Sequence, residues 1–418
     1  REIYRHSPRD AEAYERFGPL MSQIGMAVRP ILETIPPNAI RPSLSDLSAT
    51  KKLLDHFKTI STEQFEYLVK LMTMSSADFL DEWFEFDPLK ATMSASGIIG
   101  TFMGPRSPGS AYVMLHHYMG DIDGAFRSWG FQRGGTGAVS AAIARSAEHF
   151  GADIMTEAAV EKVTVKNGKA IGVTLENGDQ FDSTKVISGM DPKLTFLKML
   201  NEKDLPSDFV TSIKNFRIRG SSGKVNLALD GLPDFTCLPG NGPHLRGAIS
   251  ISPSLEYIEK AYDDAKYGNF SRSPYIDIII PSVLDPDMAP PGKHVMSCFV
   301  QYAPYNINGG WNDDKREDFG DAVINALAQY APNIKDIILH RQILTPADLE
   351  STFGLSEGNI FHGELSLQQL FIMRPAVKWA DYRTPIRNYF QCGSGTHPGG
   401  GITGSPGEMA AKKILREW

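Results

Sequence analysis

The sequence predicts a mixed α/β fold, and three observations support this prediction. Apolar residues recur at helical spacing over roughly the first 120 positions. Short stretches rich in β-branched residues follow, separated by turn signals. Near its end, the chain has an apolar strand, a glycine-rich turn and the start of a helix. With 418 residues, 42% of them hydrophobic, the chain can bury a large core and is expected to form about two or three domains.

The first part of the chain is expected to be helical. Ser7 or Asp10 caps an amphipathic helix, and Ser61 caps a later one. Asp87-Pro88 is expected to stop a helix. The segment 112–119 predicts an apolar helix whose side chains are either ordinary core or the lining of an apolar pocket. The remaining helices are predicted at 44–57, 62–79 and 80–89.

The middle of the chain predicts two groups of strands. Arg133 precedes a glycine turn that opens a helix ending near Phe150. A three-stranded meander follows at 160–165, 169–175 and 181–187, turning at Asn167-Gly168 and Asn177-Gly178. An antiparallel sheet is then predicted from strands at 224–229, 248–251, 275–281 and 294–301, with helices at 317–330 and 346–353 packed on it.

The segment 389–411 is the most informative part of the sequence. It predicts a strand that ends near Cys392, a glycine-rich turn from Gly393 to Gly404, and a helix from about Ser405. Residues without a Cβ let backbone N–H groups approach a ligand closely, and the helix directs its positive end to the same place. The pattern therefore favours a site for a phosphate or a flavin ring over a flexible glycine loop.

This turn, Gly393-Ser-Gly-Thr-His-Pro-Gly-Gly-Gly-Ile-Thr-Gly404, resembles the C-terminal flavin motif of phytoene-dehydrogenase-like FAD oxidoreductases, a branch of the amine-oxidase superfamily. The turn at 133–137, the helix after it and the Asn-Gly hairpins strengthen the resemblance. Within this family, the chain most resembles the group called pyridine nucleotide-disulfide oxidoreductase domain-containing protein 2. The segments that carry this closer likeness are 109–117, 343–350 and 358–362.

The resemblance implies an incomplete Rossmann-like FAD-binding domain interleaved with an antiparallel-sheet substrate domain and a helical cap. The expected divisions are 1–130 for the cap and part of the substrate domain, 131–195 for part of the FAD-binding domain, 196–370 for the substrate domain, and 371–418 for the C-terminal part of the FAD-binding domain. Family members open with a strand, a Gly-x-Gly-x-x-Gly turn and a helix. The opening residues of this chain contain no such unit, so we expect the chain as given to hold little FAD tightly and to be inactive by itself.

The resemblance also implies which residues contact FAD. Val160 offers its backbone to the adenine, and Ser394 stands where other amine-oxidase relatives have an acidic residue, which predicts a neutral contact to the ribityl chain. The expected flavin contacts are Gly393, Ser394, Gly395, Thr396, Gly401, Ile402, Thr403 and Gly404. No catalytic residue is assigned by these patterns. The candidates are His397, His362 and His116, each with a structural role as the alternative.

The charge and composition of the chain bear on three classes of partner: nucleic acid, metal ions and membranes. A formal net charge of −7 gives no electrostatic case for nucleic acid. Three cysteines lie scattered without C-x-x-C spacing, and the adjacent His116 and His117 diverge on a helix, so we expect no metal site. No apolar run approaches the ~20 residues of a membrane span, and no signal peptide is visible. We expect a cytoplasmic protein, or an organellar one in a eukaryote, and consider peripheral membrane contact and a homodimer.

The expected function is FAD-dependent desaturation, dehydrogenation or isomerisation of an apolar, polyene or lipid-like small molecule. The cofactor carries the hydride chemistry in such enzymes, so no Ser-His-Asp set is required. The alternative is a non-catalytic binding or scaffold protein descended from such a flavoenzyme. The glycine turn favours the enzyme, and the missing opening unit favours the alternative.

Overall fold

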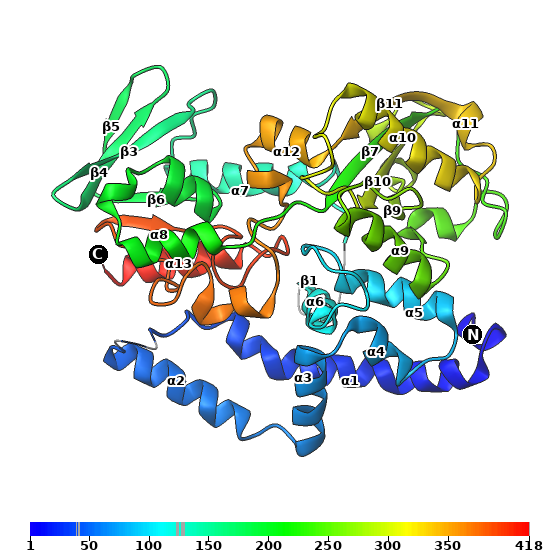
Figure 1. Ribbon diagram of the computed structural model, residues 1–418, viewed down its shortest axis with the longest axis horizontal. Coiled ribbons are helices and arrows are strands. Elements are labelled where there is room, and N and C mark those ends of the chain that lie inside the picture. Colours follow the sequence, from blue (N-terminus) through cyan, green and yellow to red (C-terminus); the bar gives the residue numbers. More distant parts are fainter. Residues whose placement is uncertain (39, 41, 123–124, 127–129, 418) are drawn as a thin grey trace.

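The computed structural model describes residues 1–38, 40, 42–122, 125–126 and 130–417. It has a mixed α/β fold, as predicted, with two sheet-containing lobes above a layer of helices (Figure 1). The sheet lobe lies at the upper right of Figure 1 and the turn lobe, which contains the glycine turn, at the left. The predicted division of the chain into domains at 1–130, 131–195, 196–370 and 371–418 stays a prediction.

The helical layer begins with α1 (Pro8–Leu32), α2 (Leu44–Phe57) and α3 (Thr62–Thr73). Ser7, one of the two predicted caps, accepts a hydrogen bond from the backbone N–H of Asp10. Asp10 is buried and instead accepts from the N–H groups of Glu85 and Phe86, which ties α1 to a later loop. Ser61 caps α3 as predicted.

The helices predicted at 62–79 and 80–89 are corrected by the structure. The first ends at Thr73, because Ser75 caps a separate helix, α4 (Ser76–Asp81). Asp87-Pro88 does not stop a helix but opens α5 (Asp87–Ser94), since proline fits the first turn, where its missing N–H has no helical partner. The apolar helix predicted at 112–119 is α6 (Ser110–His117).

The sheet lobe is built on five antiparallel strands in the order β11-β7-β10-β9-β8. Four match the predicted strands: β7 (Ser222–Leu229), β8 (Ile249–Ile251), β9 (Tyr275–Ile279) and β10 (His294–Gln301). The fifth, β11 (Ile338–Leu344), was not predicted. The helices of this lobe are α9 (Leu255–Lys266), α10 (Asp313–Ala328), α11 (Ile334–Ile337) and α12 (Pro346–Phe353).

One face of this sheet is apolar and the other is not. Val225, Leu227 and Leu229 alternate along β7 and are buried against Phe319 and Val323 of α10. The residues between them on β7 point to the opposite face, because successive strand side chains alternate. That opposite face is available to line a site.

The turn lobe contains a meander and a parallel strand pair. The meander is β3 (Val160–Lys166), β4 (Lys169–Leu175) and β5 (Gln180–Asp182). The third predicted meander strand is corrected: the chain turns at Ser183, and β6 (Val186–Ser188) pairs in parallel with β12 (Tyr389–Gln391). The helices are α7 (Gly137–His149), α8 (Ser207–Asn215) and α13 (Ser405–Leu415), and a small pair, β1 (Asp121–Ile122) and β2 (Ala125–Phe126), precedes α7.

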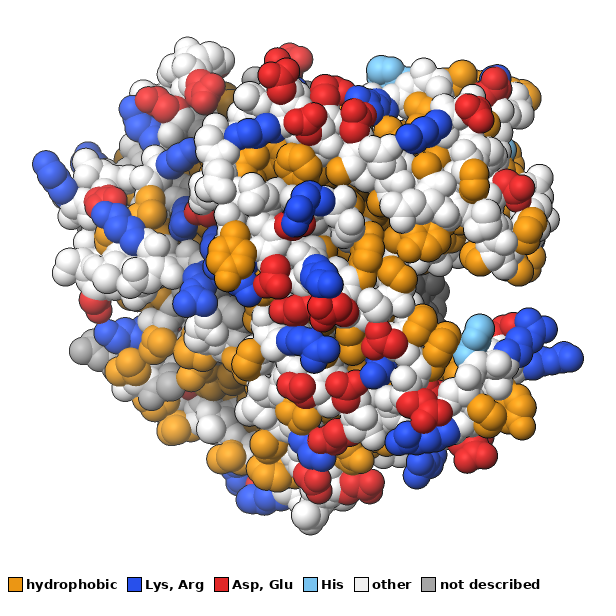
Figure 2. Space-filling model, turned by 45° about the vertical axis from the view of Figure 1, so that its right-hand side comes forward, with side chains coloured by type: hydrophobic (Ala, Val, Ile, Leu, Met, Phe, Trp, Pro, Cys, Tyr) orange, Lys and Arg blue, Asp and Glu red, His pale blue; other side chains and the backbone are white. Residues whose placement is uncertain are grey.

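Neither a membrane span nor a metal cluster is found in the described part of the chain. Across those residues, no helix combines the length and apolar character needed to cross a bilayer. No three His, Cys, Asp or Glu side chains there gather as metal ligands. Acidic and basic side chains are interspersed on the face drawn in Figure 2.

Candidate flavin site

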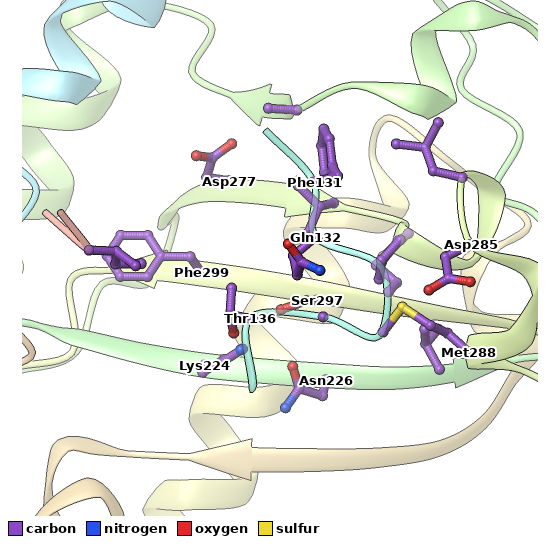
Figure 3. Close-up of a pocket in the computed structure, with 18 of the residues that line it drawn as sticks. Phe131, Gln132, Thr136, Lys224, Asn226, Asp277, Asp285, Met288, Ser297 and Phe299 are labelled. Carbon is purple, nitrogen blue, oxygen red and sulfur yellow. The ribbon is translucent and has the colours of Figure 1, made fainter. Parts of the chain in front are cut away.

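A cavity of about 1720 Å³ lies between the two lobes. Its walls include the outward face of the five-stranded sheet, residues 130–136 and the glycine turn, which are far apart in sequence. In Figure 3 the segment that carries Phe131, Gln132 and Thr136 crosses in front of the strands. The turn contributes Ser394, Gly400, Gly401 and Ile402.

The glycine turn connects β12 to α13, and four of its glycines, Gly393, Gly399, Gly401 and Gly404, have the positive φ that favours glycine. Gly393 has a φ of +80°, and a Cβ there would lie 2.7 Å from the carbonyl oxygen of Gly189. Gly404 is the N-cap of α13 at a φ of +72°, and a Cβ there would meet nothing within 4 Å. Gly393 is therefore fixed by backbone packing, whereas Gly404 leaves open space at the helix N-terminus.

The open end of the turn presents backbone donors. Among the described residues, none accepts a hydrogen bond from the N–H groups of Gly401, Ile402, Thr403 or Gly404. Ile402 is 81% exposed and has a φ of +56°, so its backbone is turned away from regular structure. Free N–H groups at a helix N-terminus are the donor set that suits a phosphate or the polar edge of a flavin.

The predicted cofactor contacts differ in their position relative to the cavity, and Gly393 is half-buried and does not line it. Ser394, Gly401 and Ile402 line the cavity, and Thr403 and Gly404 are exposed beside it. Gly395 and Thr396 are buried behind the turn, where Thr396 donates a hydrogen bond to the Gly393 carbonyl. Val160 begins β3 in the meander and does not line the cavity.

None of the three candidate histidines lines the cavity, and the rings of two of them contact backbone carbonyl oxygens. The Nε2 atom of His397 lies 2.9 Å from the Ile31 carbonyl oxygen, and that of His116 lies 2.9 Å from the Gly400 carbonyl oxygen. Burial lowers the pKa of each of these two histidines to about 4, so both are neutral near pH 7. Burial also lowers the pKa of His362, which has a φ of +54°. The described histidines that do line the cavity are His117 and His340.

The sheet face contributes polar residues that the sequence analysis did not single out. Phe299 on β10 is paired in register with Lys224 on one side and Asp277 on the other. Two residues after Lys224 on β7, the Asn226 side chain donates a 3.0 Å hydrogen bond to the side chain of Gln342 on β11. Figure 3 shows Lys224, Asn226, Asp277, Ser297 and Phe299 on this floor. The polar alternation within 222–229 was a signal for it, since every second residue there faces away from the core.

The charges of this floor are not paired with each other. Among the described residues, Lys224 makes no ion pair with Asp277, whose side-chain partner is the Ser250 hydroxyl at 3.4 Å. Burial raises the pKa of Asp277 above its ordinary value. The apolar part of the lining includes Ile99, Ile279, Met288, Ile360 and Phe361. The cavity therefore has an apolar wall and a polar floor.

Comparisons with known proteins identify the family and the fold. No protein-family model matches the chain. It is 40% identical over 433 aligned residues to pyridine nucleotide-disulfide oxidoreductase domain-containing protein 2 of Mus musculus, covering 100% of this chain and 74% of the relative. It is 28% identical to a lycopene-forming phytoene desaturase of Pseudescherichia vulneris, over 74% of this chain and 58% of that one.

Solved structures show the same fold at low sequence identity. An oxidoreductase from Methanosarcina mazei matches with a TM-score of 0.54 and 17% identity, covering 90% of this chain and 75% of that one. A putrescine oxidase variant redesigned in its cofactor binding matches with a TM-score of 0.54 and 15% identity, covering 98% and 76%.

Proposed function

Because the chain belongs to the family of pyridine nucleotide-disulfide oxidoreductase domain-containing protein 2, among the FAD-dependent oxidoreductases of the amine-oxidase superfamily, we propose that it binds FAD at the glycine turn and oxidises an apolar, lipid-like or polyene molecule in the adjoining cavity. The reaction is a desaturation, a dehydrogenation or an isomerisation. FAD, when bound, supplies the hydride acceptor. The protein supplies the binding site, the orientation and the electrostatics.

One observation carries the proposal: the glycine turn and the sheet face line the same cavity. Ser394, Gly401 and Ile402 would hold the flavin end of the cofactor, and the positive end of α13 would favour negative charge there. Gly404 leaves the space beside that helix end open. The turn lacks the charged side chains that would be needed if it bound its ligand by ion pairs.

The lining supports a substrate that is mainly apolar with one polar group. Ile99, Met288 and Phe361 offer apolar contact, and such contact is the main component of most small-molecule pockets. Lys224 and Asp277, on either side of Phe299, would orient a hydroxyl, carbonyl or carboxylate. Because the Asp277 carboxyl is shielded from water, its raised pKa favours hydrogen bonding to a neutral group over pairing with a cation.

The amount of FAD held is a separate proposal. Residues 1–38 are mainly helical and do not supply the strand and glycine turn that the family resemblance implies for the pyrophosphate. We propose that these residues by themselves hold FAD weakly. An absorption spectrum of the purified chain, followed by titration with FAD, measures this. Stoichiometric flavin retained through purification would contradict weak binding.

The substrate proposal is tested by anaerobic mixing. Protein loaded with FAD is mixed separately with apolar polyenes, with unsaturated fatty acids and with primary amines, and the loss of oxidised-flavin absorbance is followed. Bleaching by either apolar set supports the proposal, and Lys224→Met should then weaken the response to fatty acids more than the response to polyenes. Bleaching by amines alone would contradict it. Protein that takes up no FAD under any loading condition would favour the scaffold alternative.

A further inference from the structure

Arg374 is a buried cation directly behind the glycine turn. It lies after a short 3-10 turn, Phe371–Met373, and its side chain is 0% exposed. Its guanidinium donates to five backbone carbonyl oxygens: Ser394 (3.0 and 2.7 Å), Phe361 (3.0 Å), Gly363 (3.1 Å), Glu364 (3.3 Å) and Gln369 (3.3 Å). All three guanidinium nitrogens are used, so the side chain is held in one orientation.

This cation has no acidic partner among the described residues. The nearby Glu364 carboxylate is 2.6 Å from Arg219 and is paired with it, so only the Glu364 carbonyl serves Arg374. Burial lowers the pKa of Arg374 to about 10, which still leaves the group charged near pH 7. The ring of Phe216 lies 5.6 Å from the guanidinium carbon and adds a cation–π contact.

The carbonyls that hold Arg374 belong to two walls of the cavity. Ser394 and Phe361 both line the cavity and both accept from this guanidinium. A Cβ on Gly399 would lie 3.6 Å from the Arg374 Nε atom, so the guanidinium also packs beneath the far part of the turn. Carbonyl dipoles compensate a buried charge only partly, and its field acts through poorly screening protein.

We propose that Arg374 is the positioning residue of the glycine turn and that its only partly compensated charge favours the reduced, more negative state of a flavin bound there. The inference rests on the proposed function and concerns a part of that site outside the turn itself. Arg374 touches no cavity space. It acts through the Ser394 carbonyl that it fixes and through its field.

Two substitutions separate charge from hydrogen bonding. Arg374→Lys keeps the charge but loses the planar fork, and Arg374→Gln removes the charge. Arg217→Gln is the matched control, because it makes the same change in net charge at an exposed residue just beyond the end of α8 at Asn215. The FAD midpoint potential and the dissociation constant for FAD are measured for the loaded full chain in each case.

Arg374→Gln is expected to weaken binding of reduced FAD relative to oxidised FAD at least tenfold. For a two-electron couple this lowers the midpoint potential by about 30 mV. Arg374→Lys should stay near the wild-type potential, as should Arg217→Gln, while Arg374→Lys binds both forms of FAD less tightly. A wild-type potential in Arg374→Gln would overturn the charge effect.

The positioning role is also tested without FAD. In the turn, the Thr396 N–H donates to the Gly393 carbonyl and the Gly399 N–H donates to the Thr396 carbonyl. Both amides should exchange with solvent at least tenfold faster in Arg374→Lys than in wild type, while amides of β10 keep their rates. Unchanged exchange in the turn would overturn the positioning role. Failure of wild-type protein to take up FAD would overturn the proposed function, and the exchange rates alone would then decide whether Arg374 positions the turn.

Discussion

The two lobes each have a buried apolar core, but the parts of them that face the cavity are held in different ways. The sheet lobe buries a continuous apolar face of five strands beneath α10, with Phe319, Val323 and Leu327 in the contact. In the turn lobe, the parallel pair has only β6 and β12, and no residue of α7 is buried. The turn itself is held by polar contacts, above all those of Arg374. Packing fixes the floor of the site, whereas hydrogen bonds to backbone fix the turn that we propose holds the cofactor.

The largest effect is expected in the sheet lobe. Phe319 is fully buried, with the rings of Phe270 and Trp311 about it at 5.8 and 5.9 Å. Phe319→Ala should lower the free energy of unfolding by about 3–5 kcal/mol, because it removes buried surface and leaves a cavity. Urea denaturation measures this, with the exposed neighbour Asp318→Ala as control. A loss below about 1 kcal/mol would show that this face is not the main source of stability.

A smaller effect is expected from acid, and it should act on the contacts between the helical layer and the glycine turn, which His116 and His397 make. The pKa of His116 and that of His397 are each lowered to about 4 by burial, so the unfolded chain binds protons more readily than the folded one. Their stabilising contribution is complete above about pH 6.5 and is lost as the pH falls toward 4. When the pH is lowered from 7 to 5, protonation of the unfolded chain at each of these histidines should reduce the free energy of unfolding by about 2 kcal/mol.

The measurement is urea denaturation at both pH values for wild type, His116→Gln and His397→Gln. Each variant should lose less stability on acidification than wild type. If all three proteins respond to pH equally, these histidines are not the groups that couple the turn to pH.

The smallest effect is expected on α7. Ile143 is 63% exposed, and Ile143→Ala should change the free energy of unfolding by no more than ~0.5 kcal/mol. The same denaturation assay checks it. A loss near that of Phe319→Ala would mean that α7 is covered in the protein as purified, and would remove the contrast between the lobes.

The sequence was informative where the signal is local. The helix predicted at 44–57 and the helix predicted at 346–353 have the observed bounds, because their caps and apolar spacing lie within the segment. The turn from Gly393 to Gly404 was predicted from the number of glycines in that segment. Asp87-Pro88 was misread because an Asp-Pro pair fits both the end and the first turn of a helix. The strand β11 was not predicted, because His340, Arg341 and Gln342 interrupt its apolar pattern.

The rest of the site depends on contacts between distant segments. Lys224 and Asp277 face one cavity only because both strands pair with β10 in a particular register. The Arg374 side chain is held by hydrogen bonds to backbone carbonyl oxygens. Every residue has such an oxygen, so the sequence carries no pattern of residue types from which this site could be predicted. The cofactor contacts implied by family resemblance stay predictions for the residues named.

Flavin binding at the open end of the glycine turn is the central claim, and a titration of three proteins with FAD tests it most directly. Gly404→Val places a branched side chain at a φ of +72°, in the space beside the N-terminus of α13. Gly407→Ala adds a methyl group inside α13, where it meets nothing within 4 Å. We predict that Gly404→Val binds FAD at least about tenfold more weakly than wild type, while Gly407→Ala binds as wild type does. Equal FAD affinity in Gly404→Val and wild type would contradict the claim.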